Sequence, residues 1–131
     1  MRNKSVIIGG VPRSGKTLIA NQIAKQAGFS RIPGDSFITT FEELYPDMGI
    51  QHEDTLENIV KNFDPFITNF LWHLHDADGV DFVFDSYHLL PKQVKQNGFI
   101  DKFLCVFLGY ADIDPEEKLS DISQNRSLEY D

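Results

Sequence analysis

The sequence predicts an α/β fold in which a parallel sheet lies between two layers of helices, as a three-layer sandwich. Short apolar runs typical of buried strands alternate with segments whose apolar residues recur every three or four positions, as in helices. A glycine-rich loop joins the first such strand to the first helix. Strands that alternate with helices form βαβ units, and successive units build a parallel sheet.

The first strand, the loop and the first helix give the clearest part of this pattern. Residues 5–8 are predicted to form a buried strand, and apolar residues at helical spacing after Thr17 predict a helix that Gly28 ends. A short second strand is expected at 30–33. A short helix carrying Phe37 and Leu44 should follow it.

A longer helical zone is predicted between Leu56 and Leu74. Because Pro65 interrupts it, the zone reads as two helices or one kinked helix, with Asp64 as a candidate N-cap. Two further strands are expected at 80–85 and 103–108, with a helical turn at 92–97 between them. The start of another helix is predicted at 115–123.

Size and charge narrow the classes of protein that fit. The 131 residues suit one domain, and the net charge of −8 disfavours nucleic acid or an anionic membrane as the main partner, since both require a basic face. The single cysteine, Cys105, lies in an apolar run and allows no disulfide within the chain. No run approaches membrane-spanning length. We therefore expect a soluble, cytoplasmic protein.

The loop after the first strand fits the pattern Gly-x-x-x-x-Gly-Lys-Thr, which is typical of phosphate-binding loops. In such loops, backbone N–H groups curl around phosphate oxygens, and glycines permit the close approach. We expect Lys16 to neutralise the β- and γ-phosphates of a nucleotide, with its head facing solvent when no ligand is bound, and the Thr17 hydroxyl to reach Mg²⁺. The predicted cofactor-binding residues are Gly10, Val11, Pro12, Arg13, Ser14, Gly15, Lys16 and Thr17.

Two carboxylates follow strands that should end at the same edge as this loop. Ligands of parallel α/β sheets bind beyond the carboxyl ends of the strands, which would bring Asp35, Asp85 and the loop together. Asp85 is predicted to hold a water bound to Mg²⁺. Asp35 is predicted to accept a proton from an acceptor hydroxyl, but it could also cap the helix that begins near Ser36, and the two roles can coexist.

Other residues are weaker candidates for a role in the chemistry. Arg126 could neutralise a transferring phosphoryl group, or it could be an exposed tail residue. His88 could line an acceptor pocket. His73 and Asp76 are one helical turn apart, but they adjoin a predicted helix end, where histidines favour the dipole, so a zinc site is not expected there.

These residues resemble those of the P-loop small-molecule kinases, the group of adenylate kinase, shikimate kinase and chloramphenicol phosphotransferase. The segment Gly10–Thr17 matches the phosphate loop of the group, Gly34-Asp35 looks like the Gly-Asp segment of adenylate kinase, and Phe84-Asp85 is similar to its strand ending in Asp-Gly-Phe. The resemblance implies a phosphotransferase that uses ATP and Mg²⁺. It also implies that one domain spans residues 1–131, with an acceptor-binding helical region at about 36–78 and the start of a lid at about 112–131.

The chain departs from this family in two respects. Where adenylate kinase has arginines that grip a nucleotide monophosphate, Ile38 and Leu89 stand here, so an uncharged small molecule with a hydroxyl group is the favoured acceptor. The family sheet has its strands in the order 2-3-1-4-5, and this chain is expected to lack the fifth strand. It is then either a fragment of a longer protein, which we favour, or a degenerate member of the family. A non-catalytic ATP-binding module and a polynucleotide or nucleotide kinase remain alternatives.

Overall fold

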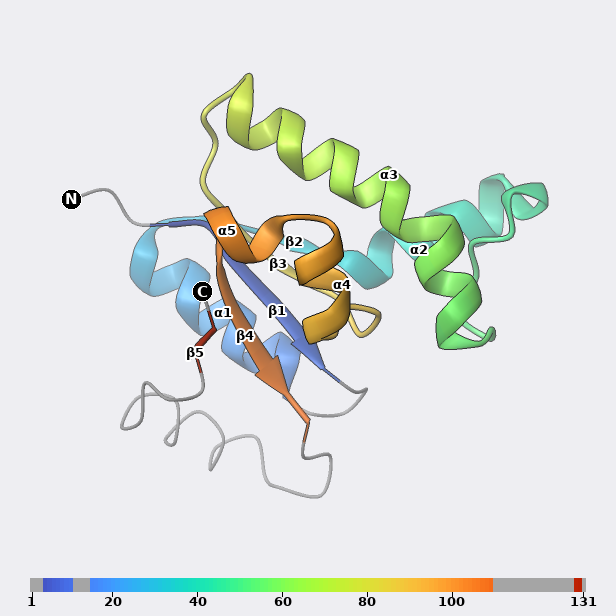
Figure 1. The fold of residues 1–131 in the computed structure, drawn as a ribbon, viewed down its shortest axis with the longest axis horizontal. Helices are drawn as coiled ribbons and strands as arrows, with labels where there is room; N and C mark the ends of the chain where they lie inside the picture. The colour runs from blue at the N-terminus through green and yellow to red at the C-terminus, as the bar shows by residue number, and fades with distance from the viewer. Residues whose placement is uncertain (1–3, 11–14, 110–128, 131) are drawn as a thin grey trace. The chain divides into compact units, whose positions relative to one another are not determined.

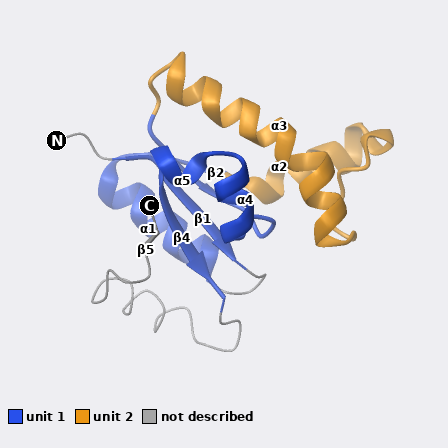
Figure 2. Cartoon of the chain, viewed as in Figure 1, with its two compact units in different colours: residues 1–32, 81–131 blue, residues 33–80 orange. Residues whose placement is uncertain are grey.

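The computed structural model describes residues 4–10, 15–109 and 129–130 (Figure 1). The chain divides into two compact units, drawn in separate colours in Figure 2. Unit 1 comprises residues 1–32 and 81–131, and unit 2 comprises residues 33–80. The helix predicted at 115–123 lies outside the described residues.

A five-stranded sheet with the order β2-β3-β1-β4-β5 forms the centre of unit 1. The strand β1 (Val6–Gly10) pairs in parallel with both β3 (Phe82–Asp85) and β4 (Leu104–Leu108). The strand β2 (Ser30–Pro33) lies next to β3 at one edge. At the other edge, β5 (Glu129–Tyr130) pairs with β4 in the antiparallel sense.

The four predicted strands are therefore present, in the strand order expected of the kinase fold. As predicted, no fifth parallel strand occurs within the described ranges. The position beside β4 is taken instead by the two residues of β5, which run the opposite way. This short strand was not predicted, because two residues show no periodicity.

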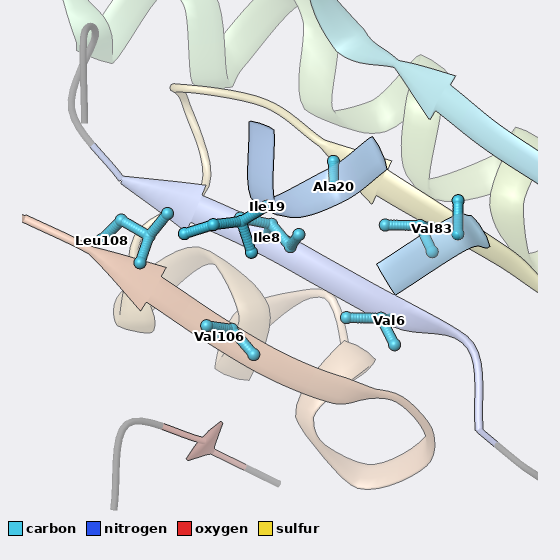
Figure 3. Packing of buried hydrophobic residues seen from close by; sticks show 8 residues of the cluster. Val6, Ile8, Ile19, Ala20, Val83, Val106 and Leu108 are labelled. Carbon is cyan, nitrogen blue, oxygen red and sulfur yellow. The ribbon is translucent and has the colours of Figure 1, made fainter. Parts of the chain in front are cut away.

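Helices cover both faces of the sheet, which confirms the predicted three-layer arrangement. Helix α1 (Lys16–Ala27) lies on one face, and α4 (Pro91–Gln96) and α5 (Phe99–Lys102) lie on the other (Figure 1). Successive side chains of a strand point to opposite faces, so each strand contributes to two cores. On the α1 face these side chains are aliphatic, and Figure 3 shows Val6, Ile8, Val83, Val106 and Leu108 beside Ile19 and Ala20 of α1.

The core on the other side of the sheet is aromatic. Phe103 packs against Phe82 of β3 and Phe99 of α5, with ring centroids 5.3 and 5.4 Å apart respectively. All three side chains are fully buried. Aromatic pairs at this separation contribute about 0.5–1.5 kcal/mol each beyond the area that they bury. The burial of both faces explains why β1, β3 and β4 read as continuous apolar runs.

Unit 2 is helical. It contains α2 (Gly34–Leu44), the short 3-10 helix η1 (Pro46–Met48) and α3 (Leu56–Asp76). Aromatic rings join the two long helices: Phe41 meets Phe66 edge-on at 4.8 Å, and Phe37 lies 5.5 Å from Phe70. Trp72, the single tryptophan of the chain, lies on α3 with its ring 6.0 Å from that of His75.

Helix α3 runs without a break through Pro65, so the two-helix interpretation is wrong. Ile59, Phe63, Ile67 and Leu71 are buried at intervals of four residues, and this stripe continues past the proline. We infer that its packing outweighs the one backbone hydrogen bond that proline removes. The N-cap is Thr55, whose hydroxyl accepts from the Asn58 N–H at 3.2 Å; Asp64, the predicted cap, lies inside the helix.

The helices also differ from the prediction in smaller ways. Helix α2 begins at Gly34 with Pro33 as its N-cap, so Asp35 occupies the first turn rather than the cap position. Helix α5 was not predicted, since four residues are too few for a helical period. None of the helices in the described part of the chain is both long enough and apolar enough to cross a membrane.

Charge is distributed unevenly between the units. Residues 33–80 contain ten Asp and Glu residues, with Lys61 as the one Lys or Arg, which gives unit 2 a formal charge of −9. The whole chain carries −8, so unit 1 carries +1. All the lysines and arginines of the chain except Lys61 therefore belong to the unit that holds the glycine-rich loop.

Candidate functional site

The two ends of the phosphate-binding loop pattern are held by β1 and α1. Strand β1 ends at Gly10, and α1 begins at Lys16 with Gly15 as its N-cap. Gly15 has φ 92° and ψ 15°, a left-handed conformation that favours glycine over residues with a side chain. Four of the predicted cofactor-binding residues, Val11, Pro12, Arg13 and Ser14, lie outside the described residues.

Two glycines at the end of β1 leave no space for a side chain. A Cβ atom on Gly9 would lie 2.1 Å from the carbonyl oxygen of Leu89. One on Gly10, which has φ 131°, would lie 1.9 Å from the carbonyl oxygen of Leu108. Backbone from two other segments therefore closes on β1 just before the loop, and this contact fixes where the loop starts.

Lys16 and Thr17 begin α1, at the end of the helix where backbone N–H groups have no partners within the helix. Thr17 is exposed. Lys16 is only 9% exposed, so the expectation that its head faces solvent is wrong.

Asp85 ends β3, beside β1, with Ile8 as its register partner. Asp85 is buried, and its carboxylate accepts two hydrogen bonds from Arg31 of β2, from Nε to Oδ1 at 2.9 Å and from Nη2 to Oδ2 at 3.0 Å. This is a bidentate ion pair, the strongest type of hydrogen-bonded contact between these side chains. Sequence reasoning missed Arg31, because the two residues are 54 positions apart.

The segment that follows Asp85 forms a tight turn. The Ser86 N–H donates to the Ile8 carbonyl at 3.0 Å, which extends the contact with β1 by one residue. The Ser86 hydroxyl and His88 Nδ1 are hydrogen-bonded at 2.5 Å, and both side chains are fully buried. A fully buried imidazole does not line an open acceptor pocket, so that expectation for His88 is wrong. The turn instead brings the Leu89 carbonyl onto Gly9.

Two predicted site residues remain, Asp35 and Arg126. Asp35 is exposed in the first turn of α2 and belongs to unit 2, whereas Lys16, Thr17 and Asp85 belong to unit 1. Its approach to them stays a prediction. Arg126 lies outside the described residues.

The described residues fit a nucleotide phosphate and Mg²⁺. Gly10 provides bare backbone where the loop starts, and the N-cap of α1 is Gly15, which has no side chain to cap the first turn. Bare backbone at a helix N-terminus suits an anion. A carboxylate and a hydroxyl, from Asp85 and Thr17, are oxygen ligands of the kind that Mg²⁺ prefers. Each Asp85 oxygen accepts one hydrogen bond from Arg31, which leaves a second lone pair on each for a bound water.

Comparison with known proteins places the fold. No protein-family model and no curated protein sequence matches the chain. Among solved structures, a gluconokinase from Sinorhizobium meliloti 1021 is similar, with a TM-score of 0.55 and 19% identity over 99% of this chain and 70% of that one. A sugar kinase from Janibacter sp. HTCC2649 has a TM-score of 0.51 and 23% identity over 95% of this chain and 68% of that one.

These similarities show that the chain has the α/β fold of the P-loop small-molecule kinases, the group that the sequence motifs resemble. At this level of identity they establish the fold alone and leave both the activity and the substrate open.

Proposed function

We propose that this chain is the catalytic domain of an ATP-dependent phosphotransferase whose acceptor is the hydroxyl group of a small molecule. The observation that carries the proposal is the seat formed in unit 1: Gly10 and Gly15 at the ends of the loop, Lys16 at the start of α1, and Asp85 at the end of the neighbouring strand. Loop glycines, a lysine and a carboxylate are the elements that phosphoryl transfer requires, since it depends on positioning and electrostatic stabilisation.

Each residue has a distinct part in this proposal. When bound, MgATP supplies the phosphoryl group and its activation. Lys16 would offset negative charge on the β- and γ-phosphates as it develops, and Thr17 and Asp85 would orient Mg²⁺, Asp85 through water. Asp35 would hold or accept the proton of the acceptor hydroxyl. These roles are proposed from residue type and position in the chain.

The charge of unit 2 supports a neutral acceptor. Residues 33–80 correspond to the proposed acceptor-binding region and carry a formal charge of −9. A dianionic acceptor such as a nucleotide monophosphate would be repelled there, and unit 2 contains no arginine to hold it. The same charge opposes a polynucleotide acceptor. A non-catalytic ATP-binding module remains the competing function, because it needs the same seat in unit 1.

Transfer of labelled γ-phosphate from ATP to a panel of neutral polyols and sugars tests the proposal. The test variant is Lys16→Ala, and its matched control is Lys25→Ala, which removes an exposed lysine from the same helix. Lys16→Ala should lower transfer by about a hundredfold or more, and Lys25→Ala should leave it unchanged. Because Lys16 is buried, thermal unfolding of both variants must first show that each is folded.

The outcomes separate the candidate functions. ATP binding without transfer to any member of the panel would favour the ATP-binding module. A folded Lys16→Ala variant with activity within tenfold of the parent would contradict the role given to the loop. Failure of the parent to bind ATP would overturn both functions.

A further inference from the structure

The Arg31–Asp85 ion pair joins two strands at the edge of the site. Its two hydrogen bonds, of 2.9 and 3.0 Å, engage both carboxylate oxygens of Asp85. The Asp85 side chain is 7% exposed and the Arg31 side chain 24% exposed, so the carboxylate is the more buried of the two groups. The pair is therefore partly shielded from solvent, where charges interact more strongly than at an open surface.

This geometry sets two properties of Asp85. Two parallel N–H···O bonds fix the plane of the carboxylate, which a single bond would leave free to rotate. The guanidinium also cancels the formal charge of Asp85, because arginine stays protonated at all ordinary pH values. A cation that approaches Asp85 thus meets an oriented carboxylate with a neutralised charge.

We infer that Arg31 is a positioning residue that weakens the coupling between Mg²⁺ and nucleotide at this site by neutralising Asp85. The inference depends on the proposed function, in that Asp85 is the carboxylate that serves Mg²⁺. With Arg31 present, Asp85 repels metal-free ATP less, and it also attracts the Mg²⁺ of MgATP less. Removal of the guanidinium should therefore increase the preference of the protein for MgATP over metal-free ATP.

The quantity to measure is the ratio of the ATP dissociation constant in EDTA to that in excess Mg²⁺, determined by calorimetry on the full chain. This ratio is a binding measurement and requires no turnover. Arg31→Gln removes the charge and keeps a group that can donate a hydrogen bond to Asp85. We expect it to raise the ratio about tenfold. Lys25→Gln, which removes a charge from an exposed position of the same unit, should change the ratio by less than about twofold.

A double-mutant cycle shows whether the effect passes through Asp85. On an Asp85→Asn background, Arg31→Gln should raise the ratio clearly less than it does in the parent, because only the direct attraction of the guanidinium for the nucleotide remains and the part that acts through the carboxylate is lost. A rise of the same size on that background would overturn the inference, as would an unchanged ratio in a folded Arg31→Gln variant.

Should Arg31→Gln not fold, Asp85→Asn alone gives the test, with an expected fall in the ratio of about tenfold. An unchanged ratio in that variant would overturn the inference. Failure of the proposed function would look different, since the parent protein would then bind no ATP under either condition, or would bind ATP without transferring phosphate to any acceptor.

Discussion

Substitution of Gly9 by alanine tests whether backbone contact, rather than backbone conformation, fixes the start of the loop. The new methyl group would lie 2.1 Å from the Leu89 carbonyl oxygen and 3.0 Å from its carbonyl carbon. Real Cβ atoms essentially never approach a neighbour within 3.0 Å, so either β1 or the turn after β3 must move by almost an ångström. Overpacking of this kind costs about 1–3 kcal/mol, and we expect the upper end because the opposing atoms are backbone.

Two other glycines provide matched controls. Gly28, at the end of α1, has φ 75° and nothing within 4 Å of its would-be Cβ, so alanine there should cost only the left-handed conformation, about 1 kcal/mol. Gly109 has an open position and no positive φ, so alanine should change stability by less than about 0.5 kcal/mol. Gly9→Ala therefore tests a steric clash, Gly28→Ala tests a conformational penalty, and Gly109→Ala involves neither effect.

Urea denaturation followed by far-UV circular dichroism measures these differences as shifts in the unfolding midpoint at constant slope. The expected order of destabilisation is Gly9→Ala, then Gly28→Ala, then Gly109→Ala. If Gly9→Ala proved no more destabilising than Gly28→Ala, the Leu89 carbonyl would not be held against β1, and the argument that this contact fixes the loop would fail.

Two further predictions concern carboxylates. Asp85→Asn should weaken the Mg²⁺ dependence of transfer and slow transfer to every acceptor, whereas Asp35→Asn should slow transfer by about tenfold or more and spare ATP affinity. Acceptor kinetics and ATP titration on both variants check this. Weakened ATP binding with normal acceptor turnover in Asp35→Asn would show that the roles are wrongly assigned. Hydrogen bonds from the Asn58 side chain and the Thr55 N–H lower the pKa of Asp54 below its usual 3.8. The ionised carboxylate therefore stabilises the fold at pH values above its usual pKa. The stability advantage of the parent over Asp54→Asn, measured by urea denaturation, should disappear as the pH falls through the lowered pKa. An advantage that stays independent of pH down to pH 2 would contradict this prediction.

The sequence predicted the elements of unit 1 well because burial leaves a strong pattern there. Strands β1, β3 and β4 are covered on both faces, and each appears as an unbroken apolar run. Helix α1 ends at Ala27, and Gly28, the residue predicted to stop it, is its C-cap in a left-handed conformation. Helix α3 was harder to predict, because local rules give Pro65 a breaking effect that the buried stripe around Phe63 and Ile67 outweighs.

Long-range contacts at the site were beyond reach of the sequence. The pairing of Arg31 with Asp85 depends on β2 lying beside β3 and on both side chains pointing to the same face of the sheet, and no local pattern encodes either condition. The burial of Lys16 was missed for a related reason, since lysine is read as exposed unless its surroundings are known. The glycines of β1 show the reverse case, because a glycine motif points directly to close backbone contact.

The position of Trp72 makes unit 2 optically distinct. It is the single tryptophan of the chain, it lies on α3, and unit 1 contains none. Tryptophan emission therefore follows the folding and environment of residues 33–80, whereas far-UV circular dichroism averages over both units. Coincident unfolding curves from the two signals would mean that the units unfold as one cooperative body. A change in Trp72 emission on addition of ATP would report communication from the loop-bearing unit to the acidic helical one.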